Sequence, residues 1–332
     1  MVNLGIIGAG RIGKVHAQSI MQRIPGARVK TIADTFMNDE IRGWAKELGI
    51  ISCVEDYREI LSDPGIDAVL ICSSTDTHAP ISLEAIAAGK HVFCEKPVSQ
   101  DLDEILAVKK ALQSSPVKYQ VGFNRRFDHN FKAVRTAIAE GAIGDQRIIK
   151  ITSRDPAPPP IAYIKPSGGM FMDMTIHDFD MLRYLAGCEA DTVFVSAANL
   201  VDPAIGKEGD VDTALVTLTM KNGAIALIDN CREAAYGYDQ RVEVLGSLGQ
   251  IATGNDTAST AVLSTAGGVC AEKPLYFFLE RYMDSFAQEM KEFICAIENG
   301  SPIPVGIEDG LQAALLAIAA ERSLKEGRPV KV

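Results

Sequence analysis

Three side chains that could together move a proton lie on one short stretch of the chain. Asp173, His177 and Asp180 stand four and three residues apart, so on a helix they would share one face. A histidine that titrates near neutral pH can accept the proton of a hydroxyl group as a general base. A carboxylate one turn away can fix the imidazole tautomer or hold a neighbouring hydroxyl group. This spacing therefore predicts a site that deprotonates an alcohol.

Two other interpretations of this stretch stay open. His177 could be a buried histidine whose ring nitrogens are satisfied by nearby carboxylates, with no part in chemistry. Asp173, His177 and Asp180 could also hold a metal ion. Oxygen-rich ligands on one helix, without a second cluster of histidines, make a poor site for a transition metal, so we expect no metal here.

A glycine-rich motif stands near the start of the sequence. Gly8, Gly10 and Gly13 fit the pattern G-x-G-x-x-G, which follows the apolar run Leu4–Ile7 and precedes a helical pattern. Gly8 would permit a tight turn, Gly10 would let a pyrophosphate approach the backbone, and Gly13 would let the helix pack closely on the strand. The free N–H groups and positive dipole end of that helix suit phosphate. The motif predicts a dinucleotide-binding fold.

Asp34 distinguishes between the two nicotinamide dinucleotides. It ends the second apolar run, at the offset where a carboxylate accepts hydrogen bonds from the ribose hydroxyls of NAD. It would repel the 2′-phosphate of NADP, and residues 35–37 offer no arginine to hold one. Arg11 and Ile12 stand where the phosphates would bind, and Arg11 leaves room for use of NADP. We expect NAD as the cofactor.

Lys96 supplies a further chemical group. It belongs to Cys94-Glu95-Lys96-Pro97, which continues from the apolar run His91–Cys94. In open α/β sheets ligands bind beyond the carboxyl ends of the strands, so Lys96 should lie near the nicotinamide. Its ammonium group could hydrogen-bond an alcohol oxygen as that oxygen gains negative charge. Lys96 and His177 together point to the oxidation of an alcohol by hydride transfer.

The elements that must position these groups follow from the apolar pattern. In the first third of the chain, strands are predicted at 4–7, 29–33, 68–72, 91–94 and 118–121. Helices are predicted between them at 12–23, 39–48, 57–61, 81–88 and 102–113. This alternation is typical of a doubly wound parallel α/β sheet. We therefore expect an NAD-binding Rossmann domain at residues 1–122.

The pattern changes after Gly122. Helices are predicted at 131–140, 171–185, 282–298 and 311–326, and strands at 147–153, 192–197, 214–220, 224–230 and 241–245. Asn222-Gly223 is a strong hairpin signal, and the proline-rich residues 155–160 predict a stiff surface loop. We expect residues 123–332 to form an α+β domain for substrate binding and oligomerisation, with a large, mostly antiparallel open sheet.

The composition excludes several classes of protein. Of 332 residues, 47% are hydrophobic and 23% charged, which is typical of a globular protein. The net charge of −10 is spread along the chain, and no stripe of Lys and Arg is available for nucleic acid. No apolar run approaches the ~20 residues of a membrane-spanning helix, and the first residues do not resemble a secretory signal. Seven scattered cysteines without a C-x-x-C pair predict reduced thiols and a cytoplasmic location.

The order of the motifs adds a family resemblance. Gly8–Gly13, Glu95-Lys96-Pro97 and Asp173-x-x-x-His177 together resemble the Gfo/Idh/MocA oxidoreductases, over the whole length of the chain. Within that family, Ser167–Met181 and Tyr236–Arg241 are similar to the inositol-oxidising members of bacteria. The resemblance implies NAD-dependent oxidation of myo-inositol to 2-keto-myo-inositol, carried out by a homotetramer.

The resemblance also implies roles for individual residues. Lys96, Asp173 and His177 would be the catalytic residues and would contact the substrate, with His177 taking the proton. The cofactor site would additionally use residues after the fourth strand and at the nicotinamide ribose, namely Ser73, Ser74, Thr75, His78, Glu95 and Lys96. For His78 the alternative is a structural place at the start of a helix.

A polyol substrate needs several directional polar groups. Besides the catalytic residues, the candidates are Asn124, Arg126, Asp155 and Tyr236. Arg125 and Arg126 are adjacent, and one of the two should be structural. Tyr236 and Tyr238 would share a strand face, and either could be plain sheet packing.

Other functions fit the same motifs. A dehydrogenase of scyllo-inositol, D-chiro-inositol or an aldose would have the same fold and catalytic residues, and only its polyol contacts would differ. A non-catalytic protein that senses NAD is a candidate from another class, but it would not need a proton acceptor. Strands 214–220 and 224–230 carry apolar residues on both faces, which predicts that a neighbouring subunit covers one face.

Overall fold

The computed structural model describes every residue from 1 to 332, and the chain forms two compact units. The first unit comprises Met1–Phe127 and Met283–Ala314, and the second comprises Asp128–Tyr282 and Leu315–Val332. The sequence predicts two consecutive domains divided at residue 122, whereas each unit is made of two separate segments. The reason is a late helix whose apolar face belongs to the core of the first unit.

A six-stranded sheet forms the centre of the first unit, in the order β3-β2-β1-β4-β5-β6, and all of its pairs are parallel. Its strands are β1 (Val2–Ile7), β2 (Ala27–Ala33), β3 (Ser52–Val54), β4 (Ala68–Ile71), β5 (His91–Glu95) and β6 (Tyr119–Gly122). β4 is buried along its whole length, as expected of a strand covered on both faces. The chain order reverses between β1 and β4, the point at which ligands bind in sheets of this class. The predicted doubly wound Rossmann sheet is confirmed.

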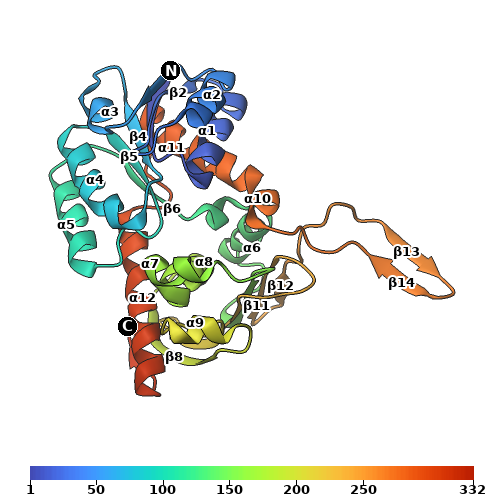
Figure 1. Ribbon diagram of the computed structural model, residues 1–332. Coiled ribbons are helices and arrows are strands. Elements are labelled where there is room, and N and C mark those ends of the chain that lie inside the picture. Colours follow the sequence, from blue (N-terminus) through green and yellow to red (C-terminus); the bar gives the residue numbers. More distant parts are fainter. The chain divides into compact units, whose positions relative to one another are not determined.

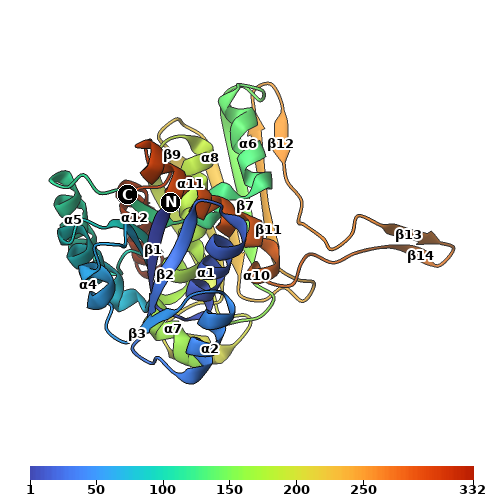
Figure 2. The same ribbon diagram turned by 90° about the horizontal axis from the view of Figure 1, so that it is seen from above.

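Helices cover both faces of this sheet (Figures 1 and 2). On one side lie α1 (Arg11–Arg23), α2 (Asp39–Glu47) and α11 (Met283–Asn299), and on the other lie α4 (Thr75–Ala87) and α5 (Leu102–Gln113). The unit also contains α3 (Arg58–Ser62) and the 3₁₀ turn η1 (Asn124–Phe127). Met290, Phe293 and Ile294 of α11 are buried in one core with Leu4 and Ile6 of β1.

The second unit is built on a seven-stranded sheet in the order β12-β11-β7-β10-β9-β8-β15. Its strands are β7 (Gln146–Arg154), β8 (Ala190–Ala198), β9 (Thr213–Met220), β10 (Ile225–Cys231), β11 (Asp239–Gly246), β12 (Gln250–Ala252) and β15 (Val330–Lys331). Only β7 and β10 pair in parallel. The prediction of a large, mostly antiparallel sheet is therefore confirmed. The proline-rich residues 155–160 form an irregular segment after β7, as predicted.

Seven helical elements belong wholly or partly to the second unit. They are α6 (His129–Ala139), α7 (Ile161–Ser167), the π-helix η2 (Phe171–Thr175), α8 (Ile176–Ala186), α9 (Pro203–Lys207), α10 (Phe278–Arg281) and α12 (Ile307–Glu326), of which α12 begins in the first unit. None of the chain's helices is both long and apolar enough to cross a membrane.

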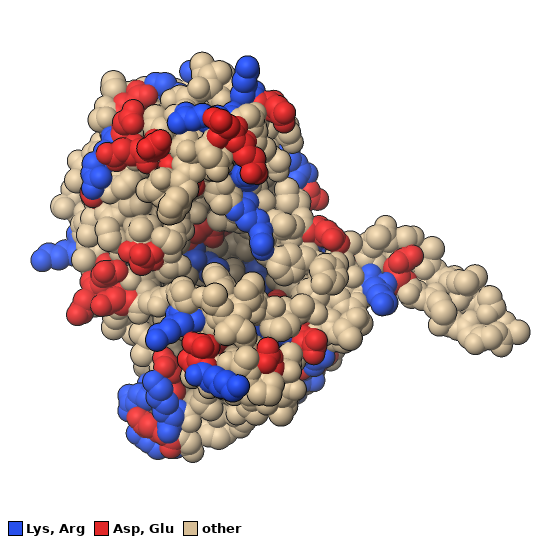
Figure 3. Space-filling view, viewed as in Figure 1, with Lys and Arg blue, Asp and Glu red and all other residues tan.

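A two-stranded hairpin, β13 (Val262–Thr265) and β14 (Gly268–Ala271), projects from the second unit (Figure 1). It was not predicted, because all of its residues are exposed and its alternation therefore has no buried face to mark it. Figure 3 shows the projection as almost free of charged side chains, in agreement with the absence of charge between Asp256 and Glu272. Elsewhere in that view, basic and acidic side chains are interspersed.

The seven-stranded sheet has one buried face and one open face. Val216, Leu218 and Ile228 point to the buried side, as the two-residue period of a strand requires. On the other face, Leu215, Ile225 and Ile148 remain 48%, 60% and 38% exposed. Apolar residues therefore occupy both faces of β9 and β10, as the sequence predicts.

Candidate active site

The glycine-rich loop between β1 and α1 has the geometry that its motif predicts. Gly8 has a φ of +104°, and a Cβ atom there would lie 2.6 Å from the backbone of Cys72. A Cβ atom on Gly13 would lie 2.0 Å from the carbonyl oxygen of Gly8. A Cβ atom on Gly10 would meet no other atom within 4 Å. The space beside Gly10, at the N-terminus of α1, can therefore admit the pyrophosphate of a dinucleotide.

Asp34, at the end of β2, is held against this loop. Its Oδ2 accepts a hydrogen bond of 2.7 Å from the N–H of Ala9, and its Oδ1 accepts one of 2.8 Å from the N–H of Phe36. Each carboxylate oxygen can accept a further bond, so ribose hydroxyls remain possible partners. Arg11 is exposed and Ile12 half-buried at the start of α1. These residues fit NAD as the sequence predicts.

The segment after β4 carries the other predicted cofactor residues. The hydroxyl groups of Ser73 and Thr77 lie 2.6 Å apart, and Thr77 donates a hydrogen bond to the carbonyl oxygen of Ser74. Ser74 is the residue before α4, and Thr75 is the first residue of that helix. α4 begins six residues before its predicted start, and Pro80 lies inside it. The proline concealed the first turn of the helix from the sequence pattern.

His78 is buried rather than open to a ligand. Its Nδ1 lies 2.8 Å from the carbonyl oxygen of Pro97, and its Nε2 lies 3.1 Å from that of Ser73. Burial, the largest effect, lowers the pKa of the imidazole, but the nearby Cys94 and the two carbonyl acceptors outweigh it and raise the pKa to about 9. A doubly protonated ring can donate to both carbonyls at once. His78 thus links the Ser73 segment to the segment that carries Lys96.

Glu95 is held by a residue that sequence reasoning missed. Nε2 of His16, on α1, lies 2.7 Å from Oε1 of Glu95, and the ring of His16 is fully buried between Phe93 and Phe286. On the other side, a Cβ atom on Gly122 would lie 2.9 Å from Oε2 of Glu95. The only signal for His16 in the sequence was its place in α1, three residues after Gly13. Lys96 follows Glu95 and is half-buried.

The predicted substrate residues of η1 make contacts inside the first unit. The amide of Asn124 donates to Oγ of Ser285 at 3.2 Å, and Oγ of Ser285 donates to the carbonyl oxygen of Asn124 at 2.8 Å. Nη2 of Arg126 donates to Oδ1 of Asp309 at 2.8 Å. Arg125 is the more deeply buried of the two arginines, with 5% of its surface exposed.

In the second unit, the predicted catalytic stretch is helical but not uniform. Residues 171–175 form the π-helix η2, and α8 continues from Ile176. Of residues 171–180, only Asp173 and His177 are not fully buried. Short π-helical segments are frequent at functional sites because they widen one turn and re-aim its side chains. Asp173 and His177 are therefore the two side chains of this stretch that a ligand can reach.

Asp180 is buried, whereas the sequence predicts that it lies on the same helix face as Asp173 and His177. It is 1% exposed, and its Oδ1 lies 3.8 Å from Nη1 of Arg183. Asp180 lies in the regular helix α8 with His177, and its ion pair with Arg183 one turn further along accompanies its burial. Asp178 is also buried, where it accepts a hydrogen bond of 2.8 Å from the amide of Asn230.

The end of β10 holds this helical stretch in place. Asn230 lies on β10 and Arg232 directly follows the strand, and both side chains contact η2. The Asn230 side chain accepts from Oγ1 of Thr175 at 2.7 Å, in addition to its bond to Asp178. Nη1 of Arg232 lies 3.3 Å from Oδ2 of Asp173. Neither Asn230 nor Arg232 was singled out from the sequence, because a strand's last polar residues do not reveal which helix they meet.

Tyr236 and Tyr238 do not share a strand face, so this part of the prediction is wrong. Both lie in the loop before β11, and Gly237 between them has a φ of +131°. Tyr238 is buried against Phe277 and Tyr282, whereas Tyr236 is 41% exposed. The exposed fraction leaves Tyr236 accessible to a ligand.

The hydroxyl group of Tyr236 already has protein partners. It donates to Oδ2 of Asp239 at 2.6 Å and accepts from Nη1 of Arg154 at 2.9 Å. Burial would raise the pKa of Asp239, but hydrogen bonds from Arg241, Tyr236 and Asn255 lower it to about 2. The half-buried Asp155 follows Arg154 at the end of β7, and its N–H donates to the carbonyl oxygen of Cys231.

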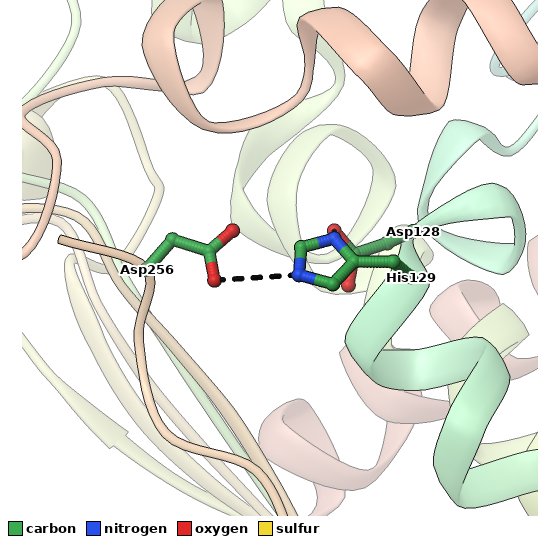
Figure 4. Close-up of side chains that lie close together, drawn as sticks. All are labelled: Asp128, His129 and Asp256. Carbon is green, nitrogen blue, oxygen red and sulfur yellow. Dashed lines mark ion pairs between the residues drawn. The ribbon is translucent and has the colours of Figure 1, made fainter. Parts of the chain in front are cut away.

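Asp128, His129 and Asp256 form the one compact group of potential metal ligands (Figure 4). His129 lies 3.6 Å from Asp256, the contact dashed in Figure 4. A cation is already present, because Nη1 of Arg281 lies 2.5 Å from Oδ2 of Asp128 and 2.7 Å from Oδ2 of Asp256. We therefore describe this group as a charge-compensated ion-pair cluster.

Comparisons with known protein families match two long segments of the chain. Residues 2–123 match the profile of the oxidoreductase family with an NAD-binding Rossmann fold, and residues 131–252 match the GFO/IDH/MocA C-terminal domain. The chain belongs to the GFO/IDH/MocA oxidoreductase family. The resemblance stated from the sequence motifs is confirmed.

Several members of this family are similar to the chain over its full length. A myo-inositol 2-dehydrogenase of Thermotoga maritima is 48% identical, over 100% of this chain and 98% of its own. An inositol 2-dehydrogenase of Rhizobium meliloti is 45% identical, over 100% and 99%. The crystal structure of a scyllo-inositol dehydrogenase from Lactobacillus casei, with bound NAD(H) and scyllo-inositol, superposes with a TM-score of 0.92 at 30% identity, covering 100% of this chain and 99% of that one.

Proposed function

We propose that this chain is an NAD-dependent inositol 2-dehydrogenase that oxidises myo-inositol to 2-keto-myo-inositol. The observation that carries the proposal is that Asp173 and His177 are the only residues of 171–180 that are not fully buried, in a chain that also has the glycine-rich loop. The relatives at 48% and 45% identity, named as inositol 2-dehydrogenases, support the substrate. NAD, when bound, would supply the acceptor for the hydride that leaves the alcohol carbon.

In this proposal His177 accepts the proton of the hydroxyl group that is oxidised. Lys96 donates a hydrogen bond to the same oxygen, where negative charge develops as the proton leaves. Asp173 orients the reacting group through its carboxylate. The carbon–hydrogen bond breaks, its electron pair leaves with the hydride, and the oxygen becomes the carbonyl oxygen of the ketone. The alcohol thus loses one hydrogen as a proton to His177 and the other as a hydride to the cofactor, which balances the reaction.

The remaining polyol hydroxyls need further partners, and we assign them to Asn124, Arg126, Asp155 and Tyr236. Asn124 donates to Ser285 and Arg126 donates to Asp309, so contacts within the first unit hold both side chains in place. Asp155 is half-buried and Tyr236 is 41% exposed, which leaves both open to a ligand. Of the cofactor residues, His78 would act through the backbone of Ser73 and Pro97.

We also propose that the enzyme is a homotetramer of a reducing, cytoplasmic compartment. The open sheet face with Leu215, Ile225 and Ile148 supports a subunit interface, since monomers rarely expose apolar patches of this kind. The hairpin β13–β14 adds exposed Leu263 and Val269. All seven cysteines are free, which supports a compartment that keeps thiols reduced.

The experiment that tests the activity is a substrate panel. NADH formation would be measured with myo-inositol, scyllo-inositol, D-chiro-inositol and D-glucose, each with NAD and with NADP. We expect turnover of myo-inositol with NAD and little with NADP, because Asp34 faces the ribose site. Turnover confined to another isomer or to glucose would retain the mechanism and overturn the substrate.

A sensor of NAD is the alternative from another class. His177→Ala separates the two, because a dehydrogenase should lose about 10²–10⁴-fold in turnover when its general base is removed. If His177→Ala still bound NAD and the protein kept its function, the sensor would be favoured.

A further inference from the structure

Arg232 is a buried charge in direct contact with a proposed catalytic residue. Its side chain is 1% exposed, and the residue directly follows the end of β10. Nη1 lies 3.3 Å from Oδ2 of Asp173, and Nη2 lies 3.8 Å from Oδ2 of Asp210. The guanidinium group therefore stands between two carboxylates.

The hydrogen bonding of Arg232 is poor for a structural arginine. Its Nε and Nη2 donate no hydrogen bond, although both are shielded from solvent. Arg183 in the same unit shows the contrast, since its Nε and Nη2 donate to Glu189 at 2.6 and 2.7 Å as a fork. Arg232 is therefore held by the charges of Asp173 and Asp210 and not by a bidentate fork.

Asp173 is fixed from its other side as well. The hydroxyl group of Tyr163, on α7, donates to Oδ1 of Asp173 at 3.3 Å, so the two carboxylate oxygens have different partners. Asp210 in turn accepts a hydrogen bond of 3.0 Å from the N–H of Met170, directly before η2. Arg232 thus joins Asp173 to the start of its own helical stretch.

We propose that Arg232 is the positioning residue for Asp173, and that it orients the carboxylate for the alcohol oxidation. This inference rests on the proposed function. Arg232 itself touches neither the reacting atoms nor the cofactor in this scheme. Its effect reaches the reaction through Oδ2 of Asp173, with Asp210 as the second carboxylate that holds the guanidinium in place.

The test compares Arg232→Met with Arg232→Lys and with the matched control Arg183→Met. Because a displaced catalytic group costs roughly 10²-fold, we expect Arg232→Met to lower kcat for myo-inositol by about that factor while the KM for NAD stays within about 2-fold. Arg232→Lys keeps the charge without the fork and should recover part of the loss. Arg183→Met should lower the melting temperature and leave kcat nearly unchanged.

A double-mutant cycle with Asp173→Asn decides whether Arg232 acts through Asp173. In the Asp173→Asn background, we expect Arg232→Met to lower kcat by less than about 3-fold, because the carboxylate it positions is gone. The inference would be overturned if the kcat losses of the two single variants multiplied in the double variant, or if Arg232→Met kept the wild-type kcat. If Arg232→Met does not fold, Arg232→Lys in the same cycle gives the decision. A wild-type chain without polyol turnover would overturn the proposed function and this inference with it.

Discussion

Arg281 and Asp128 form a buried bidentate ion pair, with contacts of 2.5 Å and 3.1 Å, at two of the three places where the chain passes between its units. Asp128 is the first residue of the second unit, and Arg281 stands one residue before the last of that segment. Both side chains are almost completely shielded from solvent. The ion pair thereby joins two segments of the chain that are far apart in sequence.

Asp128→Asn should destabilise the protein, because it removes one charge of a buried pair and leaves Arg281 with Asp256 alone. We expect a loss of about 3 kcal/mol, seen as a melting temperature lower by roughly 5–10 °C. His129→Ala is the control, since that side chain is 68% exposed and should change little. Equal melting temperatures for both variants would contradict the assigned role of the pair.

Gly10 and Gly13 should respond differently to alanine. Gly13→Ala places a Cβ atom 2.0 Å from the Gly8 oxygen and should reduce stability by about 2 kcal/mol or more. Gly10→Ala meets no atom within 4 Å, so the protein should melt as the wild type does. Its methyl group would occupy the space for the pyrophosphate, and the KM for NAD should rise by at least about 10-fold. Thermal melting checks the predicted effects on stability, and NAD titration checks the predicted effect on cofactor binding. Unaltered NAD affinity in Gly10→Ala would show that the phosphates bind elsewhere.

His78 should make stability depend on alkaline pH. Its pKa is about 9 in the folded chain and near the ordinary histidine value of 6.5 when unfolded, so protonation of the ring stabilises the folded state. The contribution is complete below about pH 6.5 and disappears as the pH rises through about 9, with a size of up to about 3 kcal/mol. Unfolding free energies from pH 6 to 10 should fall in the wild type and stay flatter in His78→Gln. Parallel curves would show that the ring is not charged in the folded chain.

The open sheet face should carry the subunit contacts. Leu215→Lys combined with Ile225→Lys puts two charges among exposed apolar side chains on β9 and β10. We expect light scattering to show a particle several times 35.7 kDa for the wild type and a smaller one for the variant. Leu200→Lys is the control, since Leu200 is 76% exposed and lies outside the sheet. A wild-type particle of one chain would refute the homotetramer.

Much of the fold followed from local patterns in the sequence. Buried parallel strands such as Ala68–Ile71 are short continuous apolar runs, and helices such as Leu102–Gln113 have one buried side. The predicted strand ends then determined where Asp34 and Lys96 stand on the sheet. These features depend on residues that are neighbours in sequence, so the local hydrophobic pattern is sufficient to predict them.

What could not be predicted depends on residues far apart in the sequence. The contact of His16 with Glu95 spans 79 residues and that of Arg232 with Asp173 spans 59, and no local pattern encodes such pairs. The π-helical turn at Phe171–Thr175 and the burial of Asp180 in α8 are likewise not revealed by the residue spacing alone. The exposed hairpin β13–β14 has no buried face, so its residues carry no hydrophobic alternation that separates inside from outside.

The return of residues 283–314 to the first unit has a consequence for synthesis of the protein on the ribosome. Met290, Phe293 and Ile294 complete a core that begins with Val2 and Leu4, so the first 122 residues emerge with part of that core uncovered. The second unit in turn waits for Leu315–Val332, which includes the strand β15 beside β8. The first unit cannot reach its native packing until residues 283–314 have left the ribosome, nor the second until residues 315–332 have done so, and apolar helices and strands stay exposed to other chains until then.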